Sequence, residues 1–387
     1  MTNTNIDYIE KFNEVWKKSQ QLLGEQITPR ILVGGKTGVG KSSVLNAMMG
    51  KDVYEIGVLP TTRKNDEHIW ESLDADIKVI DAPGFGEANE PQSSENKYED
   101  NIKKLAQLEA HIFLLVLKCD DRALDLESKY LEKWKNDPIL RELPVILVIN
   151  QIDKMKPTRD WNPKELNLKV PITEKEKNIR YYIDYVASLE NFSDYFYNST
   201  KGHVVPISAG ESFNDPYQYG IEELREKIYE ALPESAKTLF ARAAEIKKKE
   251  ANRIIRNYSA SCAGAVAVNF TPASDAFILA PIQIAMIINL GKLYNLDITK
   301  SAASGIVTSL GLSLAGPVIC QTIVSFIPVI KNLVGPPLAF GLTYSIGRAV
   351  SELFAQGKTM ATKEELKDLA KKYGEEGRRA ADEYIAN

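Results

Sequence analysis

The residues with the clearest chemistry are glycines, lysines and a serine set close together near the start of the chain. Residues 35–42 read GKTGVGKS. Glycines at such spacing let successive backbone N–H groups point inward around a phosphate, and the lysine reaches the outer phosphates. The loop lies between an apolar run and a helical stretch, so a helix N-terminus adds a favourable dipole. We predict a nucleotide-phosphate site formed by Gly35, Lys36, Thr37, Gly38, Val39, Gly40, Lys41, Ser42 and Ser43.

Two later motifs indicate which base this site would select. Residues 150–153 read NQID and follow an apolar run. The carboxylate of Asp153 can accept two hydrogen bonds from the edge of guanine, whereas over adenine it would be left unpaired. Residues 206–210 read PISAG, and the Ala209 N–H can meet the guanine carbonyl. We predict a guanine site formed by Asn150, Gln151, Asp153, Ser208 and Ala209.

Two short motifs between these sites offer oxygen ligands near the third phosphate. PTTRK at 60–64 contains two threonine hydroxyls, and DAPG at 81–84 follows another apolar run. Either motif alone would be interpreted as an ordinary turn. Hydroxyl and carboxylate oxygens suit Mg²⁺, and a backbone N–H after the strand can meet the γ-phosphate. The predicted Mg²⁺ ligands are Ser42, Thr62 and, through a water molecule, Asp81.

The ordered motifs GKTGVGKS, TT, DAPG, NQID and SAG resemble those of the Era/TrmE-like P-loop GTPases, over about residues 25–233. The resemblance implies a domain that binds GTP or GDP with Mg²⁺ and hydrolyses GTP to GDP and phosphate. It also implies that loops around the second and third motifs are ordered by the γ-phosphate and relax after hydrolysis. The residues that the resemblance assigns to catalysis are Lys41, Thr62 and Gly84.

Three departures from the family pattern bear on affinity and catalysis. Gln151 stands where the family usually has a lysine over the purine ring, and Phe85 stands where Ras-like members have a water-positioning glutamine. Gly38 stands where K⁺-dependent members have asparagine. We therefore expect slow intrinsic hydrolysis, or catalysis completed by a partner protein or by a second copy of the chain docked across the nucleotide face.

The elements that must position these motifs follow from the pattern of apolar runs. RILVG, DIKVID, HIFLLVLKC, PVILVIN and HVVPIS alternate with longer amphipathic segments, which is typical of a parallel sheet covered by helices. Most of the motifs follow one of these runs, at the edge of such a sheet where nucleotides bind. The predicted fold is α/β. It comprises an N-terminal amphipathic helix over 1–24, a P-loop GTPase domain over 25–233 and an all-α domain over 234–387.

Two polar segments interrupt this alternation. Residues 154–172 are polar and contain prolines, which predicts a surface excursion before a helix. The sequence assigns no function to this excursion. Asp120 and Asp121 follow the third apolar run, and we interpret them as a turn at a helix start.

The last part of the chain contains a long tract that is poor in charge. Residues 301–330 contain no Asp, Glu, Lys, Arg or His and are long enough to cross a bilayer. Prolines and many small residues are unlike a simple membrane anchor. Three interpretations stay open: a soluble bundle that associates with a membrane, a purely soluble bundle, and an integral span. The pattern around residues 272–286 resembles the C-terminal helical domain of YcjF-type proteins.

Composition excludes several classes of protein. The three cysteines are far apart and the three histidines lie in separate segments, so neither a disulfide scaffold nor a zinc site is expected. No KH-like GXXG motif in basic surroundings appears in the sequence, so nucleic-acid binding is not indicated. The first residues carry charge where a secretory signal has an apolar run, which predicts a cytoplasmic protein, with peripheral membrane association left open.

These observations lead to one functional hypothesis and two alternatives. We predict a GTP-hydrolysing switch whose helical domain passes the nucleotide state to a membrane surface or to a protein partner. The alternatives are a membrane-inserting or membrane-remodelling protein that GTP controls, and a ribosome-assembly GTPase.

Overall fold

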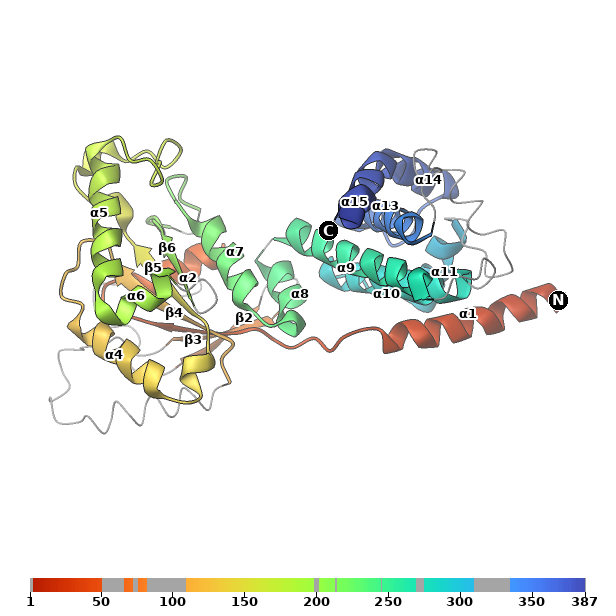
Figure 1. Cartoon of the computed structure of the whole chain (residues 1–387), viewed down its shortest axis with the longest axis horizontal. Coiled ribbons are helices and arrows are strands. Elements are labelled where there is room, and N and C mark those ends of the chain that lie inside the picture. Colours follow the sequence, from red (N-terminus) through yellow and green to blue (C-terminus); the bar gives the residue numbers. More distant parts are fainter. Residues whose placement is uncertain are drawn as a thin grey trace. The chain divides into compact units, whose positions relative to one another are not determined.

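The computed structural model describes residues 3–50, 66–71, 76–81, 109–197, 202–212, 214–244, 246–268, 275–309 and 335–386. Contacts divide the chain into two compact units (Figure 1). One runs from residue 27 to residue 244, and the other joins the residues up to 26 with those from 245 onward. Thr62, Gly84 and Phe85 lie outside the described residues.

The first unit is built on a six-stranded sheet with the order β2-β3-β1-β4-β5-β6. β2 pairs antiparallel with β3, and the other neighbouring strands pair in parallel. The mainly parallel sheet predicted from the sequence is confirmed. The strands are β1 (Arg30–Gly34), β2 (Asp66–Glu71), β3 (Asp76–Asp81), β4 (Ile112–Lys118), β5 (Val145–Asn150) and β6 (Gly202–Pro206).

The strand β2 is absent from the apolar runs that the sequence analysis assigned to strands. Its sequence, DEHIWE, is largely polar. β2 stands at the end of the strand order and pairs with β3. Charged residues are common in edge strands, because they discourage pairing with other chains. A search for apolar runs therefore finds the central strands and misses this one.

Helices flank the sheet, as predicted. Alternate residues of a strand face opposite sides, and Phe113, Leu115 and Leu117 of β4 share one buried core with residues of α4 and α5. There the ring of Phe113 stacks on that of Trp134, with 4.4 Å between the centroids. The helices of this unit are α2 (Lys41–Met49), α4 (Asp125–Asn136), α5 (Glu174–Ser188), α6 (Glu190–Tyr197), α7 (Ile221–Ala231) and α8 (Glu234–Ala243).

The helix α8 lies where the sequence analysis placed a domain boundary, after residue 233. In the structure α8 contacts β3 and α7, so the first unit extends to residue 244. The helix predicted near the N-terminus is α1 (Asn3–Gln21), which packs against α10 (Asp275–Leu293) with Phe12 and Val15 buried. The domain bounds at residues 24 and 233 remain a prediction made from the sequence.

Over its described residues the second unit contains helices and the turns between them but no strand, in agreement with the predicted all-α domain. α13 contacts α9 and α15, while α10 contacts α9 and α1. The helices of the second unit are α1 (Asn3–Gln21), α9 (Lys247–Val268), α10 (Asp275–Leu293), α11 (Lys300–Ser309), α13 (Pro336–Ala355), α14 (Lys363–Lys372) and α15 (Gly374–Ala386).

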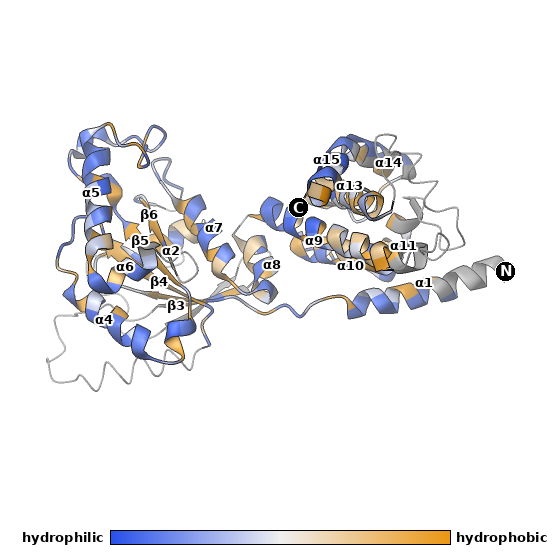
Figure 2. Ribbon diagram, in the orientation of Figure 1, coloured by the Kyte–Doolittle hydropathy of each residue, from blue (hydrophilic) through white to orange (hydrophobic). Residues whose placement is uncertain are grey.

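The hydropathy of the first unit follows its layers. Figure 2 shows apolar residues along the strands of the sheet and many hydrophilic residues on α4 and α5.

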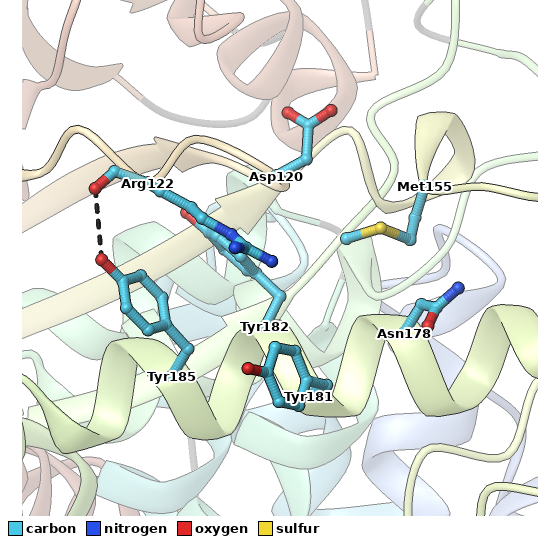
Figure 3. A pocket seen from close by; sticks show the side chains of 7 residues that line it. All are labelled: Asp120, Arg122, Met155, Asn178, Tyr181, Tyr182 and Tyr185. Atoms are coloured by element: carbon cyan, nitrogen blue, oxygen red, sulfur yellow. Dashed lines mark hydrogen bonds between the residues drawn. The ribbon is translucent and has the colours of Figure 1, made fainter.

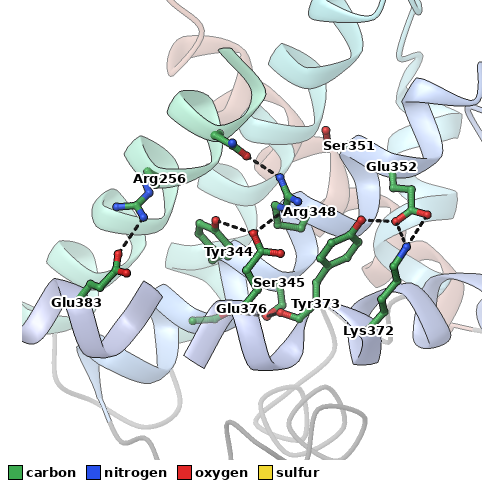
Figure 4. A network of polar contacts seen from close by, with 12 residues as sticks. Arg256, Tyr344, Ser345, Arg348, Ser351, Glu352, Lys372, Tyr373, Glu376 and Glu383 are labelled. Carbon is green, nitrogen blue, oxygen red and sulfur yellow. Dashed lines mark hydrogen bonds and ion pairs between the residues drawn. The ribbon is translucent and has the colours of Figure 1, made fainter. Parts of the chain in front are cut away.

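Close packing and polar contacts both hold α13 against its neighbours. A Cβ atom at Gly347 would lie 2.8 Å from Ile255 Cγ1, and one at Gly377 would lie 2.6 Å from the Gly341 oxygen. Ion pairs then fasten the last two helices (Figure 4). These pairs join Arg256 to Glu383 at 2.9 Å, Arg348 to Glu376 at 3.3 Å and Lys372 to Glu352 at 2.8 Å.

The apolar tract of the second unit is described only in part. Residues 310–334 lie outside the described residues, and they include most of residues 301–330, the stretch considered as a membrane span. Among the helices that the structure describes, none is both long enough and apolar enough to cross a bilayer.

Candidate functional site

The phosphate loop, NQID and SAG meet at one edge of the sheet. β1, β4, β5 and β6 are parallel neighbours, so their carboxyl ends lie side by side. The phosphate loop follows β1, NQID spans the end of β5, and SAG follows β6. Ligands of open α/β sheets bind at this edge.

The phosphate loop has the backbone conformation that its glycines allow. Gly38 and Gly40 have φ angles of 83° and 91°, and Gly35 has a φ angle of 144°. A Cβ atom at Gly35 would lie 2.3 Å from the Val116 oxygen, and one at Gly40 would lie 2.5 Å from Asn150 Nδ2. Both positions therefore require glycine for close approach as well as for conformation.

The side chains of the loop divide between the interior and the surface. Val39 is buried, Thr37 is exposed, and Ser42 and Ser43 are partly buried at the start of α2. The Lys41 ammonium donates to the carbonyl oxygens of Gly35 and Lys36, at 3.2 and 3.4 Å. Lys41 thus lies over its own loop.

One buried side chain connects the phosphate loop to both base motifs. Asn150 is 1% exposed, and its Nδ2 donates to the Val39 oxygen at 3.0 Å. Its Oδ1 accepts from the Ala209 N–H at 3.3 Å, the group that was predicted to face the guanine carbonyl. Gln151 Nε2 also donates to the Gly38 oxygen at 3.2 Å. The three motifs therefore form one hydrogen-bonded assembly.

The Asp153 carboxylate, which is predicted to select the base, accepts a hydrogen bond from Ser208 on one of its two oxygens. Ser208 Oγ donates to Asp153 Oδ1 at 2.8 Å, and Ser208 is 1% exposed. The backbone of Ser208 is fixed in turn by paired hydrogen bonds with Tyr219, at 3.0 and 3.1 Å. A carboxylate oxygen has more than one lone pair, and the other oxygen takes no part in the Ser208 bond. Asp153 is thus oriented while it keeps the capacity to accept further donors.

Comparison with known proteins agrees with this geometry. Residues 30–151 match the family model described as 50S ribosome-binding GTPase. Residues 30–151 therefore belong to a P-loop GTPase domain of the Era-like type. Residues 234–379 match a second model, described as a domain of unknown function (DUF697). The resemblance to Era-like GTPases with a YcjF-type helical domain, predicted from the sequence, is confirmed.

Individual curated relatives match less than half of this chain. GTPase Era of Clostridium botulinum is 29% identical over 163 residues, which are 40% of this chain and 53% of that protein. The uncharacterized protein YkfA of Escherichia coli is 31% identical over 132 residues, 34% of this chain and 44% of that protein. The chain thus spans about half the length of these relatives. A crystal structure of Aquifex aeolicus Era bound to GDP and AlF4⁻ is 22% identical, has a TM-score of 0.36, and covers 61% of this chain and 67% of its own.

Two acidic residues, Asp121 and Glu127, lie beside the phosphate loop of the GTPase domain, and this contact was not predicted from the sequence. Lys36 Nζ lies 3.0 Å from Asp121 Oδ2 and 3.3 Å from Glu127 Oε2, and it also donates to the Ala123 oxygen. The Glu127 contact is an ion pair without the geometry of a hydrogen bond. Lys36, predicted to contact nucleotide, is therefore directed toward the start of α4 in this structure.

The charges of this cluster influence one another. Burial alone would lower the pKa of Lys36, but the hydrogen bond with Asp121 and the charge of Glu127 outweigh it and raise that pKa. Burial raises the pKa of Glu127, which is 1% exposed. The sequence contains one signal for this cluster, because Glu127 shares the inward face of α4 with Tyr130, Leu131 and Trp134.

Tyrosines of α5 hold the same turn from the other side. Tyr182 Oη donates to the oxygens of Lys118 and Asp121, at 2.9 and 2.7 Å, and Tyr185 Oη donates to the Arg122 oxygen at 3.2 Å (Figure 3). Asp121 also accepts from the Ala123 N–H at 2.9 Å, as expected for a turn at a helix start. The tyrosines border a pocket of about 180 Å³ lined by Asp120, Arg122, Met155, Asn178, Tyr181, Tyr182 and Tyr185.

The residues predicted to hold Mg²⁺ are described only in part. Ser42 lies in the first turn of α2, and Asp81 ends β3 opposite Val33 of β1. Because β1 and β3 are parallel neighbours, these two residues lie at the same edge of the sheet. Their oxygens are ligands of the kind that Mg²⁺ prefers. Thr62 and Gly84 fall outside the described residues, so their roles stay predictions.

Proposed function

We propose that this protein binds GTP and GDP with Mg²⁺ and hydrolyses GTP. The observation that carries the proposal is the position of Asn150, which joins the phosphate loop to the loops of Asp153 and Ala209. Such an arrangement supports one ligand that has phosphates at one end and guanine at the other. The match to a GTPase family model supports the same ligand.

The proposed reaction needs few groups from the protein. A water oxygen bonds to the γ-phosphorus while the bond from that phosphorus to the β–γ bridging oxygen breaks, which yields GDP and inorganic phosphate. The attacking water loses a proton to the phosphate product or to solvent. Lys41 would move from its own loop's carbonyl oxygens to the β- and γ-phosphates and offset their growing charge. Ser42 and Asp81 would hold Mg²⁺, which supplies further charge stabilisation when bound. Asp153 would accept hydrogen bonds from guanine.

Phosphate release from purified full-length protein tests this function. With Mg²⁺ present, GTP should be hydrolysed and a large excess of ATP should not compete, because adenine leaves the Asp153 carboxylate unpaired. Equal competition by ATP would contradict the guanine site.

The same assay over a wide range of protein concentrations tests which molecule supplies the water-positioning group. Specific activity that rises with concentration would indicate a second copy of the chain, and constant specific activity would indicate a separate partner protein.

We propose further that the nucleotide state is passed to the helical domain and from there to a membrane surface or a protein partner. The match of residues 234–379 to a domain model separate from the GTPase model supports two joined functions. Fractionation of native cells into cytosol, membranes and ribosomes, with either GDP or a non-hydrolysable GTP analogue, tests this coupling. We expect the membrane-bound fraction to change with the nucleotide. Co-sedimentation with ribosomal subunits would favour a ribosome-assembly role instead.

A further inference from the structure

The polar excursion at residues 154–172 separates the base motif NQID from α5. It is short of apolar residues, yet its ends are fixed by two neighbouring charged residues at the start of α5. These residues are Lys175 and Glu176, and both are buried. Buried charges are uncommon unless they are paired or fully hydrogen-bonded.

Lys175 is hydrogen-bonded to the backbone that carries the base-selecting carboxylate. Its side chain is completely buried, and Nζ donates to the carbonyl oxygens of Asp153, Met155 and Pro157, at 2.6, 2.7 and 3.2 Å. An ammonium group has three donors, so these three oxygens satisfy it. The ammonium therefore fixes the backbone at Asp153 itself and on its C-terminal side.

Glu176 holds the far end of the excursion. Its carboxylate accepts the N–H groups of Asn167, Ile172 and Thr173, at 2.7, 2.8 and 2.8 Å. Thr173 Oγ1 accepts the Glu176 N–H in return, which completes a capping box at the start of α5. The hydrogen bonds from backbone N–H groups lower the pKa of Glu176 to about 2. The excursion is thus held at both ends by the first turn of one helix.

Trp161, in the middle of the excursion, extends the connection to the second base motif. The Lys175 ammonium lies 5.4 Å from the centre of the Trp161 ring, within the range of a cation–π contact. Trp161 Nε1 donates to the Tyr217 oxygen at 3.1 Å, and its ring meets that of Tyr219 edge-on at 6.3 Å. Tyr219 is hydrogen-bonded to Ser208, and Ser208 to the Asp153 carboxylate. The contacts therefore form a continuous series from the Asp153 backbone, through Lys175 and Trp161, back to the Asp153 side chain.

We propose that Lys175 and Trp161 are positioning residues that hold Asp153 in place and so determine how strictly the site selects guanine. The inference rests on the proposed function, because it assumes that Asp153 recognises the base. Neither Lys175 nor Trp161 is proposed to contact the base. Each acts through the backbone and side chains of the two base loops.

The test compares the affinities of GDP and inosine diphosphate for the full-length protein with Mg²⁺. Inosine diphosphate lacks the 2-amino group, so the ratio of the two dissociation constants measures recognition by Asp153 separately from phosphate binding. Lys175→Met should reduce the preference for GDP at least about tenfold, comparable with the loss of one hydrogen bond to a charged group. Trp161→Leu should reduce the same preference by a smaller factor.

Lys177→Met is the matched control, because Lys177 is exposed on the same helix, and it should leave the ratio unchanged. A loss of overall stability alone would weaken both nucleotides equally, and that result in folded Lys175→Met would overturn the inference. Thermal unfolding shows whether each variant is folded. Should Lys175→Met fail to fold, an unchanged ratio in Trp161→Leu would overturn the inference by itself. A wild-type protein that does not prefer GDP would overturn the guanine site as well.

Discussion

Replacing Lys41 with alanine should abolish measurable GTP hydrolysis. The residue begins α2 and lies over the carbonyl oxygens of its own loop, in a position from which its ammonium can reach the β- and γ-phosphates. Removing one such charge-stabilising donor costs about 10²–10³-fold in kcat, and the expected slow intrinsic rate would then fall below detection. Single-turnover hydrolysis at saturating GTP measures this effect without interference from weakened binding.

The matched control for this experiment is Lys129→Ala, because Lys129 is exposed on α4. Its hydrolysis rate should equal that of the wild-type protein. Turnover by Lys41→Ala within a few fold of wild type would show that the phosphate site has been assigned to the wrong loop. The thermal stability of the two variants should be compared first, so that a folding defect is recognised.

Changing Asp153 to asparagine should shift the preference of the site from guanine toward xanthine nucleotides. The amide presents a donor where the carboxylate presented an acceptor, and xanthine carries a carbonyl oxygen in place of the guanine 2-amino group. Two hydrogen bonds to a charged carboxylate contribute about 3 kcal/mol or more, so the GDP-to-XDP preference should fall at least about 100-fold. Competition between the two diphosphates for labelled GDP measures the shift.

Asparagine is a suitable replacement because it keeps an oxygen that can accept the Ser208 hydroxyl, which lies 2.8 Å from Asp153 Oδ1. The change therefore alters the edge presented to the base more than the position of the side chain. Asp184→Asn, on the exposed side of α5, is the control and should bind GDP as the wild type does. Unchanged guanine preference in Asp153→Asn would place the base site elsewhere.

The sequence was sufficient to predict the central sheet and the motifs at its edge. Strands β4 and β5 are apolar in every residue but the last because both of their faces are buried, and that pattern can be read directly. The loop glycines could also be predicted, but for a different reason: their positive φ angles exclude most other residues. The edge strand β2 could not, because its polar sequence resembles that of a loop.

The contacts between the motifs could not be predicted from the sequence. Asn150 joins Val39 and Ala209 across 111 and 59 positions, and no local pattern specifies such pairs. Lysine side chains are usually exposed. The partial burial of Lys36 against acidic residues and the full burial of Lys175 against carbonyl oxygens depend on the packing of α4 and α5. The segment at residues 154–172 lies at the surface before α5, as predicted, since none of its residues is buried. Its hydrogen bonds to Lys175 and Glu176 could not be predicted.

The two hydrogen bonds of Asn150 have a thermodynamic consequence. A single rigid amide has its nitrogen in the phosphate loop and its oxygen at the SAG loop, so a shift of either loop changes the geometry of the other bond. Free-energy changes caused by separate substitutions in the two loops should therefore fail to add, and a double-mutant cycle would give a non-zero interaction energy. If the proposed site is correct, we expect substitutions in the phosphate loop to change the preference for the base as well as the affinity for phosphate, because Asn150 is bonded to both loops.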